Sequence, residues 1–323
     1  MYRLKKSITT VASGMISLGV LLLAVAGSAG ADEKSTPGKP PAARKTVFIP
    51  PENAASRSPA LEGIARGAPA GRDSVLVFSA PPREAKADSI RIYQPIAEYL
   101  SRVTGKTIVY QHPTDWLTYQ MEMLRGSYDI IFDEPHLNSW RISNLRHSVL
   151  VKIADEHAYT VVVHKDNKRI ANVKQLAGQK VCGMDPPNLG TLALLSKFDN
   201  PVRQPLIVNS GTWTKAYEGV ATEEKCEAAI IPLANLENMS GSENTVHVIY
   251  KTKALPNQAF SAGPRVSTLD QAKISAALLS REGRAATAQL MSAYASAIGL
   301  VYANNKEYAG LDVYLKDTWG YAR

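Results

Sequence analysis

The sequence predicts an α/β protein with two lobes that face each other across a cleft, because a helix–strand unit occurs twice in it. Residues 115–140 have the pattern of a helix, a stop at Gly126, a buried strand and a polar loop. The same order recurs over residues 212–238, with Gly219 near the end of the helix. Lobes of this kind close on ligands by hinge motion. Any two strand–helix–strand units share much of this pattern, so chance similarity is the alternative.

The loop after the first of these strands, at residues 129–132, is the expected edge of the cleft. It contains Asp133, Glu134 and His136. Ligands of parallel α/β sheets bind outside the carboxyl ends of the strands. These three side chains are therefore predicted to face the ligand.

The first lobe is predicted from alternating apolar strands and helices, and its helices have local signals. Gly105 ends the first helix, and Asp115 caps the second. Runs of apolar and β-branched residues mark the strands. The predicted elements are a strand at 75–78, a helix at 90–103, a strand at 107–110, a helix from 116, and strands at 129–132 and 149–153. A further strand at 159–163 is a candidate crossing into the second lobe.

The second lobe is predicted from the same kind of alternation, followed by a return of the chain to the first lobe. Its elements are strands at 180–183 and 228–231, helices that start after 187–191 and at 213, a return crossing at 250–260, and closing helices at 266–279 and 285–297. The lobes are therefore predicted to be residues 73–158 plus 255–323, and residues 159–254.

Residues 1–31 have the pattern of a secretory signal peptide. Basic residues precede an apolar run over residues 8–26, and an Ala-Gly-Ala sequence ends at Ala31. We expect cleavage there and a periplasmic protein. An uncleaved membrane anchor is the alternative, because the apolar run is long. No cysteine lies near the cleavage point, so a lipid anchor is not expected.

Residues 32–72 are rich in Pro, Ala, Gly and charge, and are predicted to form a flexible tether. The net charge of +8 comes mostly from this tether and the signal peptide. From Asp73 onward, 27 Lys and Arg residues stand against 25 Asp and Glu residues. This near balance gives no electrostatic footprint for nucleic acid, so no nucleic-acid partner is expected.

Both cysteines, Cys182 and Cys226, lie in the second half of the chain. Cysteines of an exported protein tend to pair, and these two fall on or beside neighbouring predicted strands. A disulfide is therefore predicted. The alternative is that the offset between the two strands exceeds the Cα separation that a disulfide tolerates.

Several stretches of the chain resemble one family. They are SAPPRE after the first strand, IAEYLSRVTGKTIVY, TDWLTYQMEMLRGSYDIIF, NVKQLAGQKVCGMDPPNLGT, and GTWTKAYEGV ahead of CEAAII. Together they resemble the periplasmic substrate-binding proteins of the phosphate, phosphite and phosphonate ABC transporters. That resemblance implies the type II periplasmic-binding-protein fold, a clamshell with two hinge crossings.

The resemblance also implies a function. It implies a receptor that captures a small ligand between its lobes and delivers it to an ABC permease or a membrane sensor, as a monomer and without a cofactor. The enzyme motifs GxSxG, HExxH, Walker A and GxGxxG are absent from the sequence, so no catalytic activity is expected.

The chain departs from the family pattern at the positions that resemble the ligand-binding ones. The family has a run of Ser and Thr at the first helix of the second lobe, whereas this chain has Pro-Asn-Leu at residues 187–189. Trp116 and Trp213 stand where the family has tyrosine and histidine, and Asp133 and Glu134 replace small residues. The departures imply that simple phosphonates are not the ligand.

Two buried carboxylates without a cation are costly, so the acids favour a cationic or zwitterionic ligand caged by the two tryptophans. Core packing is the alternative role of both tryptophans. The predicted ligand-binding residues are Ser79, Trp116, Asp133, Glu134, His136, Gly190, Thr191, Ser210, Thr212 and Trp213. A metal-delivery protein that uses His112 with Asp133, Glu134 and His136 is the alternative function, because imidazole and carboxylate suit transition metals.

Overall fold

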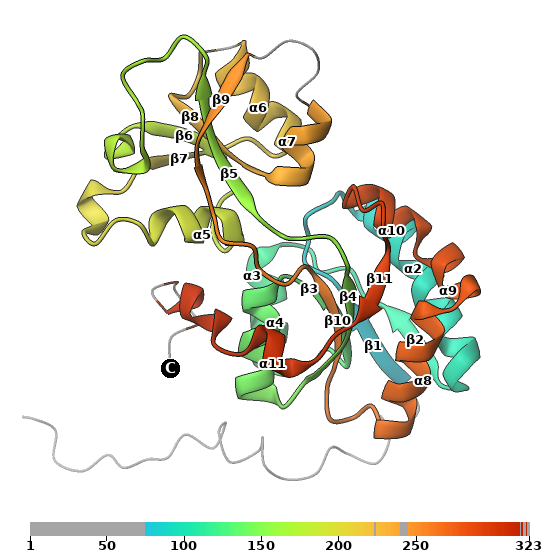
Figure 1. The fold of residues 1–323 in the computed structure, drawn as a ribbon. Helices are drawn as coiled ribbons and strands as arrows, with labels where there is room; N and C mark the ends of the chain where they lie inside the picture. The colour runs from blue at the N-terminus through green and yellow to red at the C-terminus, as the bar shows by residue number, and fades with distance from the viewer. Residues whose placement is uncertain (1–74, 223, 240–244, 317, 319–320, 322–323) are drawn as a thin grey trace, which may run out of the picture. The chain divides into compact units, whose positions relative to one another are not determined.

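A computed structural model describes residues 75–222, 224–239, 245–316, 318 and 321. The predicted signal peptide and tether, residues 1–72, lie outside the described residues. The described residues form two β-sheets that share no strand (Figure 1). The chain passes from the first sheet to the second after β4 and returns after β9. The two connecting segments pair with each other as an isolated antiparallel bridge between His157 and Leu255.

The first sheet has the strand order β11-β4-β10-β3-β1-β2. Strand β1 pairs in parallel with β2 and β3, and β10 is antiparallel to β3 and β4. Its strands are β1 (Val75–Ser79), β2 (Thr107–Tyr110), β3 (Ile130–Asp133), β4 (Ser148–Ile153), β10 (Ala259–Ala262) and β11 (Leu300–Tyr302). Its helices are α2 (Lys86–Thr104), α3 (Trp116–Leu124), α4 (Pro135–Leu145), α8 (Thr268–Leu279), α9 (Arg281–Ala286), α10 (Ala288–Ala293), α11 (Asn305–Tyr308) and η3 (Leu311–Leu315).

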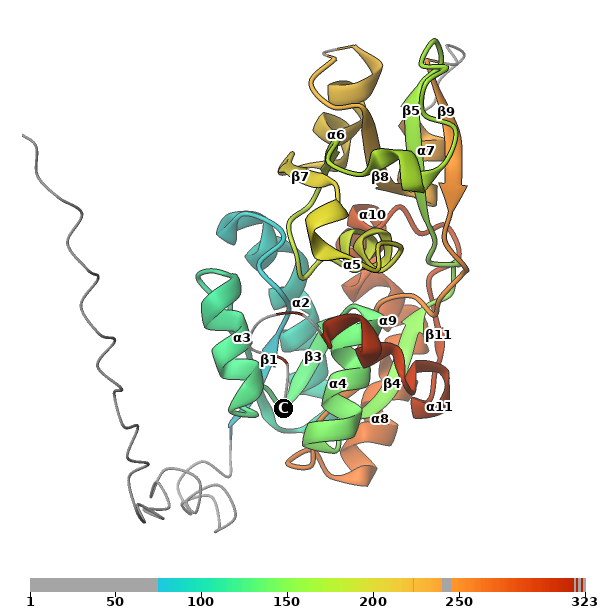
Figure 2. The ribbon, with the colours of Figure 1, turned by 90° about the vertical axis from the view of Figure 1, so that its left-hand side faces the viewer.

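Helices cover both faces of this sheet. Helices α2, α8 and α10 bury one face in an apolar cluster that includes Phe78, Phe132 and Phe260. Helices α3 and α4 pack against the other face of β3 through Tyr119, Ile131 and Leu137 (Figure 2). Strand β3 is buried along its whole length, as the apolar run at this position predicts.

The second sheet has the strand order β7-β6-β8-β5-β9. Its strands are β5 (Tyr159–His164), β6 (Lys180–Gly183), β7 (Leu206–Asn209), β8 (Ala228–Pro232) and β9 (Val246–Lys251). Its helices are η1 (Val173–Leu176), α5 (Leu189–Leu195), η2 (Pro201–Arg203), α6 (Trp213–Ala221) and α7 (Leu233–Met239). Helix α5 packs on one face, and α6 and α7 pack on the other.

Local signals account for several helix ends. The side chains of Asp115, Asn188 and Thr212 accept backbone N–H groups at the starts of α3, α5 and α6. Gly105 ends α2 in the left-handed conformation at φ 69°, which a glycine adopts without strain.

Two expected elements differ from the structure. The single helix expected at 285–297 is two short helices, α9 and α10, which meet at Thr287. The Thr287 hydroxyl donates to the carbonyl of Gly283. The expected loop after β3 is also much shorter, because Asp133 ends the strand and Pro135 already opens α4. Proline suits the first helical position, where its missing N–H has no partner to lose.

Cys182 in β6 and Cys226 before β8 are joined by a disulfide, with their Cα atoms 5.7 Å apart. The offset between the two strands is therefore within the range that a disulfide tolerates. Gly219 makes room for the bridge, because a Cβ at this position would lie 2.7 Å from the Cys182 sulfur. In the described part of the chain, no helix is long and apolar enough to cross a membrane.

Replacing both cysteines by alanine should lower the free energy of unfolding by about 2 to 4 kcal/mol, because the bridge closes a long loop in the unfolded chain. The two cysteines are 44 residues apart in sequence. Urea unfolding with and without reductant measures this effect. Reductant should destabilise the wild type and leave the double variant unchanged. Equal stability of the oxidised wild type and the variant would contradict the expectation.

Candidate functional site

A buried carboxylate between two arginines forms the centre of the candidate site. Asp133, at the carboxyl end of β3, is fully buried. Its two oxygens accept hydrogen bonds from Arg141 Nη1 at 2.7 Å and from Arg83 Nη2 at 3.1 Å. The Tyr119 hydroxyl donates to the same carboxylate. Burial alone would raise the pKa of Asp133, but Arg141 and Arg83 outweigh burial and hold the pKa below its usual range.

The next residue, Glu134, connects the two sheets. Its carboxylate lies 3.5 Å from Arg83 Nη2. It also accepts the backbone N–H of Leu189 at 3.1 Å and the side-chain amide of Asn188 at 3.5 Å, both at the start of α5. Burial raises the pKa of Glu134 although Arg83 opposes the shift. Glu134 is therefore a buried acid with donors from both lobes.

His136 makes a second contact between the lobes. Its Nε2 lies 2.8 Å from the carbonyl oxygen of Pro187. A carbonyl can only accept, so Nε2 carries the proton and Nδ1 has a free lone pair. Nδ1 lies 3.6 Å from Glu134 Oε2 and has no hydrogen-bond partner among the described residues. Burial lowers the pKa of His136 to about 4, so the ring is neutral at pH 7.

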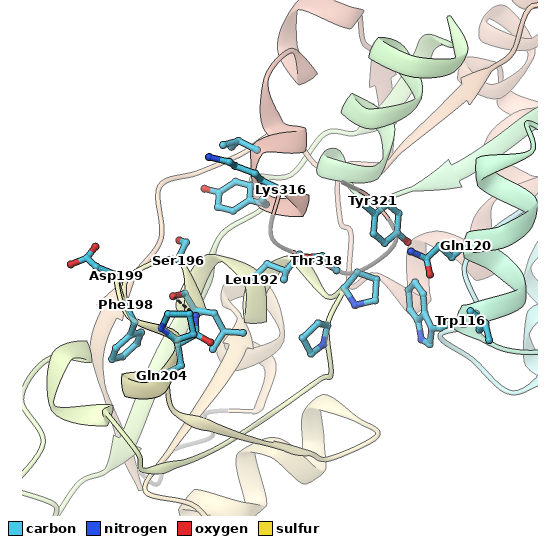
Figure 3. Close-up of a pocket in the computed structure, with 17 residues that line it drawn as sticks. Trp116, Gln120, Leu192, Ser196, Phe198, Asp199, Gln204, Lys316, Thr318 and Tyr321 are labelled. Atoms are coloured by element: carbon cyan, nitrogen blue, oxygen red, sulfur yellow. Dashed lines mark hydrogen bonds between the residues drawn. The ribbon is translucent and has the colours of Figure 1, made fainter. Parts of the chain in front are cut away.

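A cavity of about 970 Å³ lies beside the charged cluster formed by Arg83, Asp133, Glu134 and Arg141. Figure 3 shows Trp116, Gln120 and Tyr321 on one side, and residues of α5 and the segment after it on the other. Trp116 also borders the charged cluster, because the Arg83 guanidinium lies 5.8 Å from the centre of its ring. The labelled lining residues of the opposite side are Leu192, Ser196, Phe198, Asp199 and Gln204.

The chain matches a protein-family model over residues 78–308, with the description "ABC transporter, phosphonate, periplasmic substrate-binding protein". The chain belongs to this family. The family predicted from the sequence is therefore confirmed, and with it transport as the functional class. A comparison with curated proteins found no match.

Solved structures of binding proteins have the same fold. A binding protein component of a phosphonate ABC transporter from Pseudomonas aeruginosa is 15% identical, with a TM-score of 0.55, and the alignment covers 73% of this chain and 83% of that one. PhnD1 from Prochlorococcus marinus, in complex with methylphosphonate, is 14% identical, with a TM-score of 0.58 and coverage of 76% and 98%. A protein from Xanthomonas citri bound to ATP is 11% identical, with a TM-score of 0.60 and coverage of 75% and 97%. These likenesses confirm the two-lobed type II fold.

In this binding protein, Trp116 is the predicted ligand residue that lines the cavity. Asp133, Glu134 and His136 come together at the end of β3, but each contacts residues of the protein itself. Both carboxylates have arginine counter-ions, so their burial is explained without a cationic ligand.

The hydroxyl and glycine positions predicted to bind ligand also have internal partners. The Ser79 hydroxyl donates to the carbonyl of Gln111 at 2.7 Å, and the Thr191 hydroxyl donates to the carbonyl of Met184. Gly190 lies against Tyr159, and a Cβ there would be 2.4 Å from its ring. None of these three lines the cavity.

The residues predicted before α6 lie elsewhere on the second lobe. The Ser210 hydroxyl donates to the Val208 carbonyl at 3.3 Å, and the exposed Thr212 caps α6. Trp213 packs edge-on against Tyr159, with ring centres 6.2 Å apart. The two tryptophans belong to different apolar clusters. The role of these residues in ligand binding stays a prediction.

Sequence reasoning missed Arg83, Arg141 and Tyr119. The signal was present, because two adjacent acids after a buried strand require counter-charges. From the sequence alone, that counter-charge is expected from a ligand, whereas the structure supplies it from Arg83 in the turn after β1 and from Arg141 in α4.

The metal alternative requires several free ligands in one place. Among the described residues, no group of three or more His, Cys, Asp or Glu side chains is placed to hold a metal ion. Of the four residues proposed as ligands, Asp133 is bonded to two arginines and His136 uses Nε2 for the Pro187 carbonyl.

Proposed function

We propose that this binding protein captures a small organic ligand in the cavity beside Trp116 and presents it to an ABC permease. We also propose that the ligand is not a simple phosphonate. The observation that carries the proposal is that the two acids at the end of β3 are already neutralised by the protein. Arg83 and Arg141 form ion pairs with Asp133 and Glu134. Among the residues that the structure describes, no unpaired cation remains beside these two acids to hold a phosphonate dianion.

The lining of the cavity supports an organic ligand with an apolar part. Trp116, Leu192 and Phe198 offer apolar surface, and the side-chain amides of Gln120 and Gln204 offer polar groups. A volume of about 970 Å³ is at the upper end of the range for drug-sized ligands.

Charge contributes little to this lining. The charged residues among its described lining, Asp199 and Lys316, are both exposed at the surface. Exposed charges are screened by solvent and salt. The proposal therefore depends on apolar packing at Trp116 and not on a cation held by the acids.

Calorimetric titration with phosphate and methylphosphonate tests the exclusion of simple anions. We expect dissociation constants above about 1 μM for both, because the Ser and Thr hydroxyls of the family pattern are missing and the arginines are paired. Sub-micromolar affinity for either anion would refute the proposal.

A thermal-shift screen of organic solutes, repeated on Trp116→Ala, tests the cavity. The variant should bind the best ligand at least about tenfold more weakly, since it loses the apolar area of the indole. Tyr302→Ala is the matched control, because Tyr302 is an exposed aromatic residue that does not line the cavity. Equal affinity of both variants would place the ligand elsewhere.

A further inference from the structure

We infer that Glu134 is a specificity-determining residue, whose carboxylate takes the place of a ligand oxyanion between the lobes and excludes free oxyanions. The inference rests on one part of the proposed function, namely that the ligand binds between the two lobes. The evidence is the set of donors around this carboxylate.

The first lobe positions Glu134 from two directions. It is the residue between β3 and α4, so the strand and the helix fix its backbone. The Arg83 guanidinium reaches both Asp133 Oδ1 at 3.1 Å and Glu134 Oε1 at 3.5 Å. One cation is thus shared by two adjacent carboxylates, and 17% of its side chain is exposed.

The second lobe supplies the remaining donors. Leu189 donates its backbone N–H to Oε2 at 3.1 Å, and Asn188 donates its side-chain amide to Oε1 at 3.5 Å. A guanidinium, an amide and a backbone N–H are donors that proteins use to bind oxyanions. Here they converge on a side chain of the same protein, of which only 3% is exposed.

One polar atom beside Glu134 is left without a partner. His136 Nδ1 is buried, and the described residues offer it no hydrogen bond. It faces Oε2 at 3.6 Å, so two acceptors meet without a proton between them when Glu134 is ionised. A ligand oxyanion that carries one O–H group would satisfy Nδ1, whereas an ionised glutamate does not. The position therefore also suits a partly protonated oxyanion, such as a monoanionic phosphonate.

Removing this side chain should open the position to small anions. In Glu134→Ala, acetate at about 20 mM should raise the midpoint of thermal unfolding by about 3 °C or more, because it replaces the missing carboxylate. Methylphosphonate should bind this variant at least about tenfold more tightly than it binds the wild type. The wild type should respond to neither anion.

Two further variants control the experiment. Glu122→Ala removes a carboxylate of α3 that pairs with the exposed Arg125 after the end of the helix, and acetate should not stabilise it. Glu134→Ser removes the carboxylate and keeps a small polar side chain, so it is a second test of the position where Glu134→Ala does not fold. Acetate should stabilise Glu134→Ser more than it stabilises the wild type.

Failure of this inference is distinguishable from failure of the proposed function. Sub-micromolar methylphosphonate binding by the wild type would refute the proposed function. If acetate stabilises no folded Glu134 variant and the wild type does not bind methylphosphonate, only the inferred role of Glu134 is overturned.

Discussion

Replacing Asp133 by alanine should lower the free energy of unfolding by about 3 to 5 kcal/mol, because it leaves a buried guanidinium without its counter-ion. The side chain of Arg141 is 1% exposed and donates to Asp133 at 2.7 Å. Arg83 would lose its closest carboxylate as well. Asp133→Asn should also destabilise the protein, since it keeps the shape and removes the charge. Urea unfolding at neutral pH measures both variants.

Glu122→Ala is the matched control for the loss of an acid in the same lobe. Glu122 pairs with Arg125 at 2.8 Å, and the Arg125 side chain is 61% exposed. Solvent screens this pair, so its loss should cost about 1 kcal/mol or less. A similar cost for Asp133→Ala and Glu122→Ala would show that the cluster at β3 is not the buried charge network described above.

Acidification should destabilise the protein, because three buried histidines are neutral in the folded state. Burial lowers the pKa of His136 and His157 to about 4 and that of His147 to about 3, from an ordinary value of 6.5. The unfolded chain protonates these rings as the pH falls through 6.5, so it binds more protons than the folded protein. Stability should therefore fall between about pH 6.5 and about pH 4.

Each histidine should contribute a loss of about 2 kcal/mol between about pH 7.5 and about pH 5. Glu134 acts in the opposite direction, because burial raises its pKa and its proton uptake favours the folded state. The free energy of unfolding, measured by urea titration across this range, should fall by several kcal/mol. His147→Gln should lose less stability over the range than the wild type. A free energy that stays level from about pH 7.5 to about pH 5 would contradict the histidine assignments.

The sequence predicts most of the fold because its signals are local. The apolar run of β3, the Asp115 cap and the Gly105 stop each depend on neighbouring residues only. The prediction of a single helix at 285–297 was wrong. Ser280 caps a helix that starts earlier, and Thr287 separates this helix from the next one. The apolar pattern there did not show the break.

The site is harder to predict, because its contacts join residues that are far apart in sequence. The predicted strand ends place Asp133 and Glu134 correctly. Arg83 is 50 residues before Asp133 in the chain, so no local sequence pattern indicates that the two side chains form a hydrogen bond. The direction in which a side chain points also cannot be read from the sequence. Thr191 lies at the start of a helix as expected, yet its hydroxyl donates back to the Met184 carbonyl.

Native mass spectrometry of the protein, purified without denaturation, tests most directly whether the ligand binds beside Trp116. The wild type should retain a small organic molecule without phosphorus. Trp116→Ala should lose it, and Glu122→Ala should keep it. A bound phosphonate, a wild type that retains no small molecule, or equal retention by the wild type and Trp116→Ala would contradict ligand capture in this cavity.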